Sequence, residues 1–113
     1  MRFMMVVLLS LLLTACATET SQLQKGRSDF QAGRYHSAYK TLLPLARQGN
    51  PEAQYAVGYF YYYGKGVKED EQKAQYWINQ SAQHGYAPAI RALEVEAAKN
   101  AQNTQNTKNV QKS

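Results

Sequence analysis

The chain has 113 residues, a formal net charge of +5 and a single cysteine. This length gives room for one domain with a modest core, and one cysteine excludes an intramolecular disulfide, a CxxC redox pair and a zinc cluster of cysteines. The Lys and Arg residues are scattered along the chain, which favours a solubilising surface over a nucleic-acid site.

Residues 1–15 predict an export signal, because a basic start precedes a short apolar run over residues 4–13. The run is too short to span a bilayer. It ends in Leu13-Thr14-Ala15-Cys16, which resembles the lipobox of bacterial lipoproteins. The resemblance implies a mature N-terminus at Cys16, diacylated on its sulfur, and Ala17 in place of Asp implies the outer membrane, facing the periplasm. The alternative is an ordinary signal peptide with an incidental cysteine.

Residues 16–24 are expected to be a tether, and residues 25–99 a helical domain. The first part of this domain predicts two helices joined by a short turn. The segment Phe30-x-x-Gly33-x-Tyr35-x-x-Ala38 resembles the hairpin turn of a tetratricopeptide unit. We interpret it as a divergent first repeat whose inward-facing residues are Leu23, Gly26 and Phe30 from one helix and Tyr35, Ala38, Leu42 and Ala46 from the other.

An internal repeat appears when residues 38–57 are compared with residues 74–93, a shift of 36 positions without a gap. The identical pairs are Ala38/Ala74, Ala46/Ala82, Gly49/Gly85, Ala53/Ala89 and Ala56/Ala92. All are small residues, which suit positions where helices pack closely.

A second hairpin is predicted over residues 50–85. Asn50-Pro51-Glu52 offers an N-cap, a proline at the first helical position and an acid in the first turn. Gly64 and Gly66 end this helix, and Asp70 caps the next one, which Gly85 stops. The apolar positions recur at helical spacing, at Ala53, Ala56, Val57 and Phe60 in the first helix and Ala74, Trp77, Ile78 and Ala82 in the second.

These residues resemble the Sel1-like repeat, a relative of the tetratricopeptide repeat. The matching positions are Ala53, Gly58, Tyr61, Gly64, Gly66, Asp70, Ala74, Trp77, Ala82 and Gly85. The resemblance implies an all-α fold, a short right-handed α-solenoid of antiparallel hairpins with about two repeats and a C-terminal capping helix. Residues 87–99 predict that last helix, whereas the polar segment 100–113 is expected to be disordered.

Five consecutive aromatic residues, Tyr59 to Tyr63, end the first helix of the second hairpin. Successive helical residues turn by about 100°, so the five side chains cannot share one face. We expect Phe60 to be buried and Tyr61 and Tyr63 to pack at the hairpin end. Tyr59 and Tyr62 are then the most exposed and are the candidate partner-binding residues. Base stacking on single strands is disfavoured because no basic stripe accompanies the run.

No catalytic, metal or cofactor site can be assembled from the sequence, so we expect a protein that is not an enzyme. Gly64-Lys65-Gly66 lacks the spacing of a phosphate loop, and His36 and His84 lie in separate repeats. Two functions stay open. The first is a lipid-anchored scaffold or adaptor that binds a protein or peptide through its repeat surface. The second is binding of peptidoglycan or regulation of cell-wall enzymes.

Overall fold

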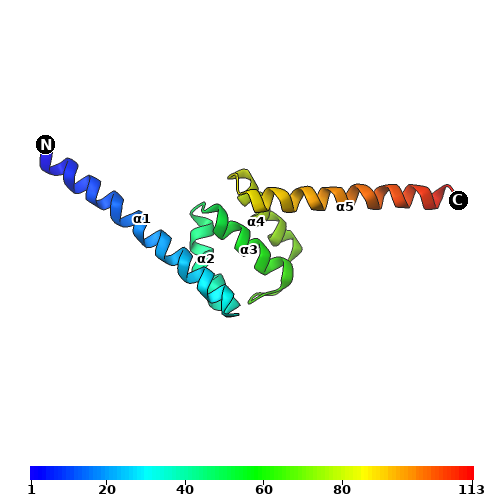
Figure 1. Cartoon of the computed structure of the whole chain (residues 1–113), viewed down its shortest axis with the longest axis horizontal. Coiled ribbons are helices and arrows are strands. Elements are labelled where there is room, and N and C mark those ends of the chain that lie inside the picture. Colours follow the sequence, from blue (N-terminus) through cyan, green and yellow to red (C-terminus); the bar gives the residue numbers. More distant parts are fainter.

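The structure is a computed structural model that describes the side chains of residues 1–10 and 18–113. Its helices are α1 (Arg2–Gln31), α2 (Tyr35–Arg47), α3 (Pro51–Tyr63), α4 (Glu71–Gln83) and α5 (Ala87–Gln111), and the described part contains no strand. Among the described residues, no helix combines the length and apolar character needed to cross a membrane. The molecule is 79 Å long because α1 and α5 project from opposite sides of the helical domain (Figure 1).

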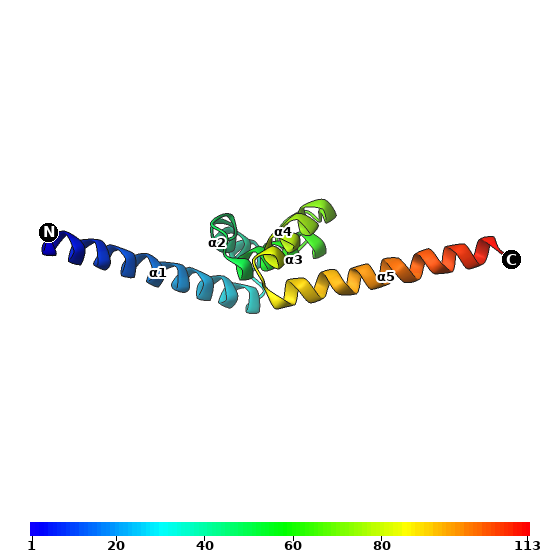
Figure 2. The same ribbon diagram turned by 90° about the horizontal axis from the view of Figure 1, so that it is seen from above.

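Each helix packs against the next one along the chain, from α1 through α5. Figure 2 shows α2 and α4 lying above the line formed by α1 and α5. First and second helices of the hairpins therefore form two layers, as in an α-solenoid. The predicted fold class is confirmed: two hairpins, α1–α2 and α3–α4, are followed by the lone helix α5.

The core is small and lies mainly between α2 and α3. Its fully buried members are Ala38, Leu42, Leu45 and Ala46 from α2 and Ala53, Val57 and Phe60 from α3. Phe60 is the largest of the side chains with no exposed surface, and its ring lies 5.9 Å from that of Phe30 on α1. One aromatic side chain thus joins the two hairpins.

The ends of α3 and α4 follow the predicted signals. The Asn50 side chain accepts a hydrogen bond from the Ala53 amide at 2.9 Å, and Asp70 accepts one from the Lys73 amide at 3.0 Å. Gly64 ends α3 with φ of 61°, a left-handed conformation that a residue with a Cβ adopts only at a cost.

The structure differs from the sequence expectation at both ends of the domain. Residues 18–24, expected to be a tether, continue α1, and residues 100–111, expected to be disordered, continue α5. These segments can be helical because a helix satisfies the hydrogen-bonding groups of its own backbone. The Thr104 and Thr107 hydroxyls also donate to carbonyls one turn earlier. Residues 100–111 are exposed throughout, so their helix lies outside the packed domain. Cys16 lies outside the described residues.

Two polar side chains occupy positions that the apolar pattern did not anticipate. Ser81, and not Ala82, is the fully buried residue of that turn, and its hydroxyl donates to the Pro51 carbonyl at 2.6 Å. Gln54 is also buried and donates to the Ala46 carbonyl at 3.1 Å. Each hydrogen bond joins two helices and compensates the cost of burying a polar group.

Candidate partner-binding groove

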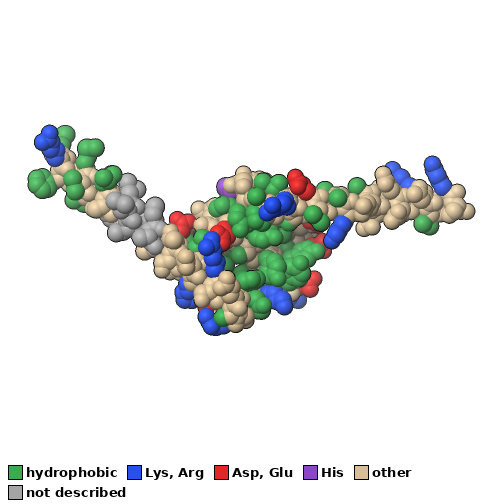
Figure 3. Space-filling view, viewed as in Figure 1, with side chains coloured by type: hydrophobic (Ala, Val, Ile, Leu, Met, Phe, Trp, Pro, Cys, Tyr) green, Lys and Arg blue, Asp and Glu red, His purple; other side chains and the backbone are tan. Residues whose placement is uncertain are grey.

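A groove runs between α3 and α5, and none of its lining residues belongs to α2. Its volume is about 390 Å³, near the lower end of the usual range for ligand sites. Hydrophobic side chains gather in the centre of the face shown in Figure 3, between the two projecting helices. The groove is lined by Tyr55, Tyr59, Tyr62 and Tyr63 of α3, Ile78 of α4, and Pro88, Arg91, Ala92, Val95, Glu96 and Lys99 of α5.

The five residues from Tyr59 to Tyr63 differ in burial, as expected for successive positions on a helix. Phe60 is buried, and the Tyr61 hydroxyl lies 2.7 Å from that of Tyr39 in a half-buried contact. Tyr62 is 47% exposed as expected, but Tyr63 is 56% exposed and Tyr59 is half-buried. The expectation that Tyr59 is among the most exposed residues is therefore wrong: Phe30 of α1 covers it, with the two ring centres 5.5 Å apart.

The tyrosines of the groove hold one another in place. The rings of Tyr59 and Tyr63 are 4.6 Å apart, and those of Tyr62 and Tyr63 are 4.9 Å apart. Tyr59 also contacts Phe60 and thereby the core. Aromatic pairs at these separations are attractive, so the groove presents a pre-arranged aromatic wall on a packed helix.

A second hollow of about 300 Å³ lies on the α1 side of α3 and shares Tyr55 and Tyr59 with the groove. The Arg27 guanidinium donates two hydrogen bonds to the Glu52 carboxylate beside it, which raises the pKa of Arg27. Burial and the nearby Glu52 raise the pKa of Tyr86. The ion pair joins α1 to α3 and fixes the distance between the first helices of the two hairpins.

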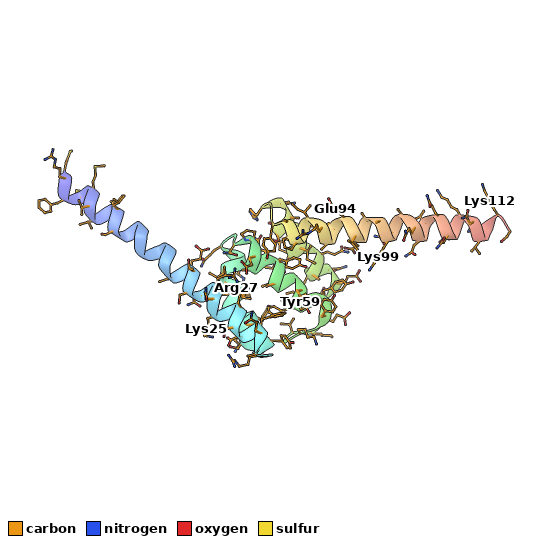
Figure 4. The ribbon with its side chains drawn as sticks, in the orientation of Figure 1. Lys25, Arg27, Tyr59, Glu94, Lys99 and Lys112 are labelled. Atoms are coloured by element: carbon orange, nitrogen blue, oxygen red, sulfur yellow. The ribbon has the colours of Figure 1, made fainter. Side chains whose placement is uncertain are left out.

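The α5 wall of the groove carries two cations, Arg91 and Lys99. Arg91 and Lys99 make no salt bridge with any side chain of the described residues. Glu96 lies on the same wall, and its carboxylate accepts a hydrogen bond from Gln75 of α4 at 3.1 Å. Figure 4 shows Lys99 on the side of α5 nearer to Tyr59 and Glu94 on the other side. The lining of the groove therefore has a net positive charge.

Neither histidine is available for chemistry in the groove. His36 contacts the Gly66 carbonyl through its Nδ1, at 3.0 Å, and His84 contacts Gln54 Oε1 at 2.9 Å. Because the Gln54 amide donates to Ala46, its oxygen faces His84, so His84 Nδ1 carries the proton. Among the described residues, no group of three His, Cys, Asp or Glu side chains could hold a metal ion.

Most of the repeat positions named from the sequence have structural roles outside the groove. Gly58 permits the close contact of α3 with α4, Gly64 and Gly66 form the loop, and Trp77 is half-buried against the core instead of fully enclosed. Only Tyr59 and Tyr62 of the candidate residues line the groove. Sequence reasoning missed Tyr63, Arg91 and Lys99. The internal repeat of 36 residues aligns residues 91–99 of α5 with residues 55–63 of α3. This alignment could have indicated that the two segments face each other.

Comparison with known proteins agrees with this architecture. Residues 51–86, which span α3 and α4, match the family model of the Sel1 repeat. No curated protein matches in sequence. A crystal structure of a Sel1 repeat protein from Oxalobacter formigenes is similar, with a TM-score of 0.62 and 29% identity over 67% of this chain. The match covers 23% of that protein's length. Residues 51–86 thus match the model of a Sel1 repeat, within a fold similar to that of a Sel1 repeat protein.

Proposed function

We propose that the protein is a lipid-anchored scaffold or adaptor of the bacterial cell envelope that binds a protein or peptide partner in the groove between α3 and α5. One observation carries this proposal: exposed, mutually packed tyrosines line a groove together with two cations that form no salt bridge within the described part of the chain. Aromatic residues and arginine are the side chains most enriched at the energetic centres of protein interfaces.

The surroundings of the groove also fit an interaction role better than catalysis. Glu96 is the one carboxylate among the described lining residues, and it contacts Gln75. That lining contains no His, Cys or Ser side chain. Sel1-like repeats generally mediate contacts between proteins. A repeat surface of this kind uses shape and side-chain chemistry to hold a partner.

The lipid anchor and the envelope location are proposed from the sequence. The apolar start and the Leu13-Thr14-Ala15-Cys16 motif support cleavage before Cys16 and acylation of its sulfur. Cys16→Ser should then give an unprocessed or soluble species, because serine has no sulfur to carry the acyl chains that would anchor the protein. Detergent partitioning of the two forms checks this. Normal cleavage and membrane partitioning of the serine form would contradict the lipoprotein assignment.

The binding role is tested by site-specific photocrosslinking in intact cells. A photoreactive amino acid at Tyr62, which is exposed in the groove, should give discrete adducts with one or a few proteins. The matched control carries it at Lys40, which is exposed on α2 and does not line the groove. Equal adducts from both positions would place the interaction elsewhere. Sedimentation of the full chain with purified cell wall, abolished by Tyr62→Ala, would favour the peptidoglycan function instead.

A further inference from the structure

The two walls of the groove differ in chemistry, and this difference constrains what binds there. The α3 wall is aromatic, with Tyr62 and Tyr63 as its exposed part. The α5 wall is cationic, with Arg91 and Lys99 separated by Val95 at helical spacing, so that all three side chains share one face of α5. An occupant must therefore offer apolar groups to one side and negative charge to the other.

We propose that the groove accepts an extended acidic peptide segment in which aliphatic side chains alternate with carboxylates. This inference rests on the proposed function and specifies its partner. In an extended chain, successive side chains point to opposite sides. One set would pack on the tyrosine wall and the other would meet the cations.

The spacing of the cations sets the spacing of the acids. Arg91 and Lys99 are eight residues apart on α5, which corresponds to about 12 Å along the helix axis. Residues four positions apart on an extended chain are separated by about 13 Å and lie on the same side. The recognised core is thus five residues long, with Asp or Glu at its first and fifth positions and aliphatic residues at its second and fourth.

The charge of the groove favours this partner over a neutral one. Arg91 and Lys99 lack salt-bridge partners in the part of the chain that the structure describes, whereas Glu96 already accepts a hydrogen bond from Gln75. A basic segment would place its positive charges beside Arg91 and Lys99, and Glu96 alone would offset little of the repulsion. Electrostatics would therefore oppose its binding. Carboxylates on the occupant would form charge-assisted hydrogen bonds with guanidinium and ammonium groups.

The test is selection from a displayed library of random peptides on the detergent-solubilised full-length chain. The expected consensus has acids four positions apart and aliphatic residues between them. Anisotropy titrations of the selected peptide should then show that Arg91→Gln with Lys99→Gln weakens binding by at least about tenfold and reduces its salt dependence. The matched control, Lys40→Gln with Lys68→Gln, removes the same charge from exposed sites outside the groove and should bind like the unchanged protein.

A neutral or basic consensus, or no enrichment, would overturn the inference. So would equal losses in the groove variant and in the control variant, since binding would then follow net charge alone. These outcomes are distinguishable from failure of the proposed function. Discrete adducts from Tyr62 in cells together with a neutral consensus would leave a partner-binding groove of different specificity.

Discussion

Gly58 of α3 lies so close to Ile78 of α4 that a Cβ at position 58 would stand 2.7 Å from the Ile78 Cγ1. The first hairpin repeats this relationship, because a Cβ on Gly26 of α1 would stand 2.4 Å from the Leu42 Cδ2. In both hairpins a glycine lets the second helix approach the first. The position 36 residues after Gly58 is Glu94 of α5. Residues 87–111 of α5 contain no glycine, so a second helix could not approach α5 as closely as α2 and α4 approach α1 and α3.

Gly58→Ala should destabilise the protein although alanine has the higher helix propensity. The added methyl would force apart α3 and α4, since backbone atoms of Ala74 and Ile78 also lie at 3.1 and 3.2 Å from it. Overpacking of this kind costs about 1–3 kcal/mol. Thermal melts would measure it, with Gln72→Ala on the exposed side of α4 as the control. An unchanged melting temperature would mean that the helices separate without cost.

The two parts of α5 should differ in their contribution to stability. Deletion of residues 100–113 removes only exposed residues and should leave the melting temperature almost unchanged. Deletion from Ala87 onward removes Ala89, which is fully buried, and uncovers one side of α4. We expect that form to unfold or to melt far lower. Identical melting of the longer deletion and the full chain would show that α5 is a free binding element and not a cap.

The sequence predicted the hairpins and their ends because those features depend on local signals. Asn50, Asp70 and Gly64 act through backbone groups within a few residues, so spacing alone identifies their roles. The groove depends on which helix lies beside which. Tyr63 was expected to pack at the hairpin end and is exposed, whereas Tyr59 was expected to be exposed and is covered by Phe30. The extents of α1 and α5 were missed because polar composition was interpreted as disorder.

Phe60→Ala should be more damaging than Trp77→Ala, the reverse of what side-chain size suggests. Phe60 has no exposed surface and joins α1, α2 and α3, whereas Trp77 is only half-buried. Removal of a fully buried large aromatic side chain costs about 3–5 kcal/mol, and the Trp77 change should cost about half of that because its side chain keeps contact with water. Denaturant unfolding of both variants compares them. A larger loss for Trp77→Ala would place the centre of the core between α3 and α4 instead of between α2 and α3.

A carboxylate beside the turn between α1 and α2 makes the stability of the fold depend on pH. Asp29 is buried, and its carboxylate accepts hydrogen bonds from Ser37 at 2.8 Å, Lys25 at 3.0 Å and Arg34 at 2.8 Å. These donors, the Ser37 hydroxyl foremost, hold the pKa of Asp29 well below its usual range. A lowered pKa in the folded state means that the carboxylate stabilises the fold at neutral pH. That stabilisation is lost as the pH falls below about 4, the pKa of an unfolded aspartate.

Asp29→Asn separates this effect from general acid denaturation, because asparagine keeps the size of the side chain and removes its charge. The variant should melt below the unchanged protein at pH 7, and the gap should narrow steadily as the pH is lowered from 5 toward 2, because the Asp29 carboxyl takes up a proton in the unfolded state at a higher pH than in the folded state. Glu69→Gln, at an exposed loop position, serves as the control and should show no such convergence. A gap between Asp29→Asn and the unchanged protein that stays constant over this range would mean that the negative charge of Asp29 contributes nothing, and that its hydrogen bonds hold the turn equally well when the group is neutral.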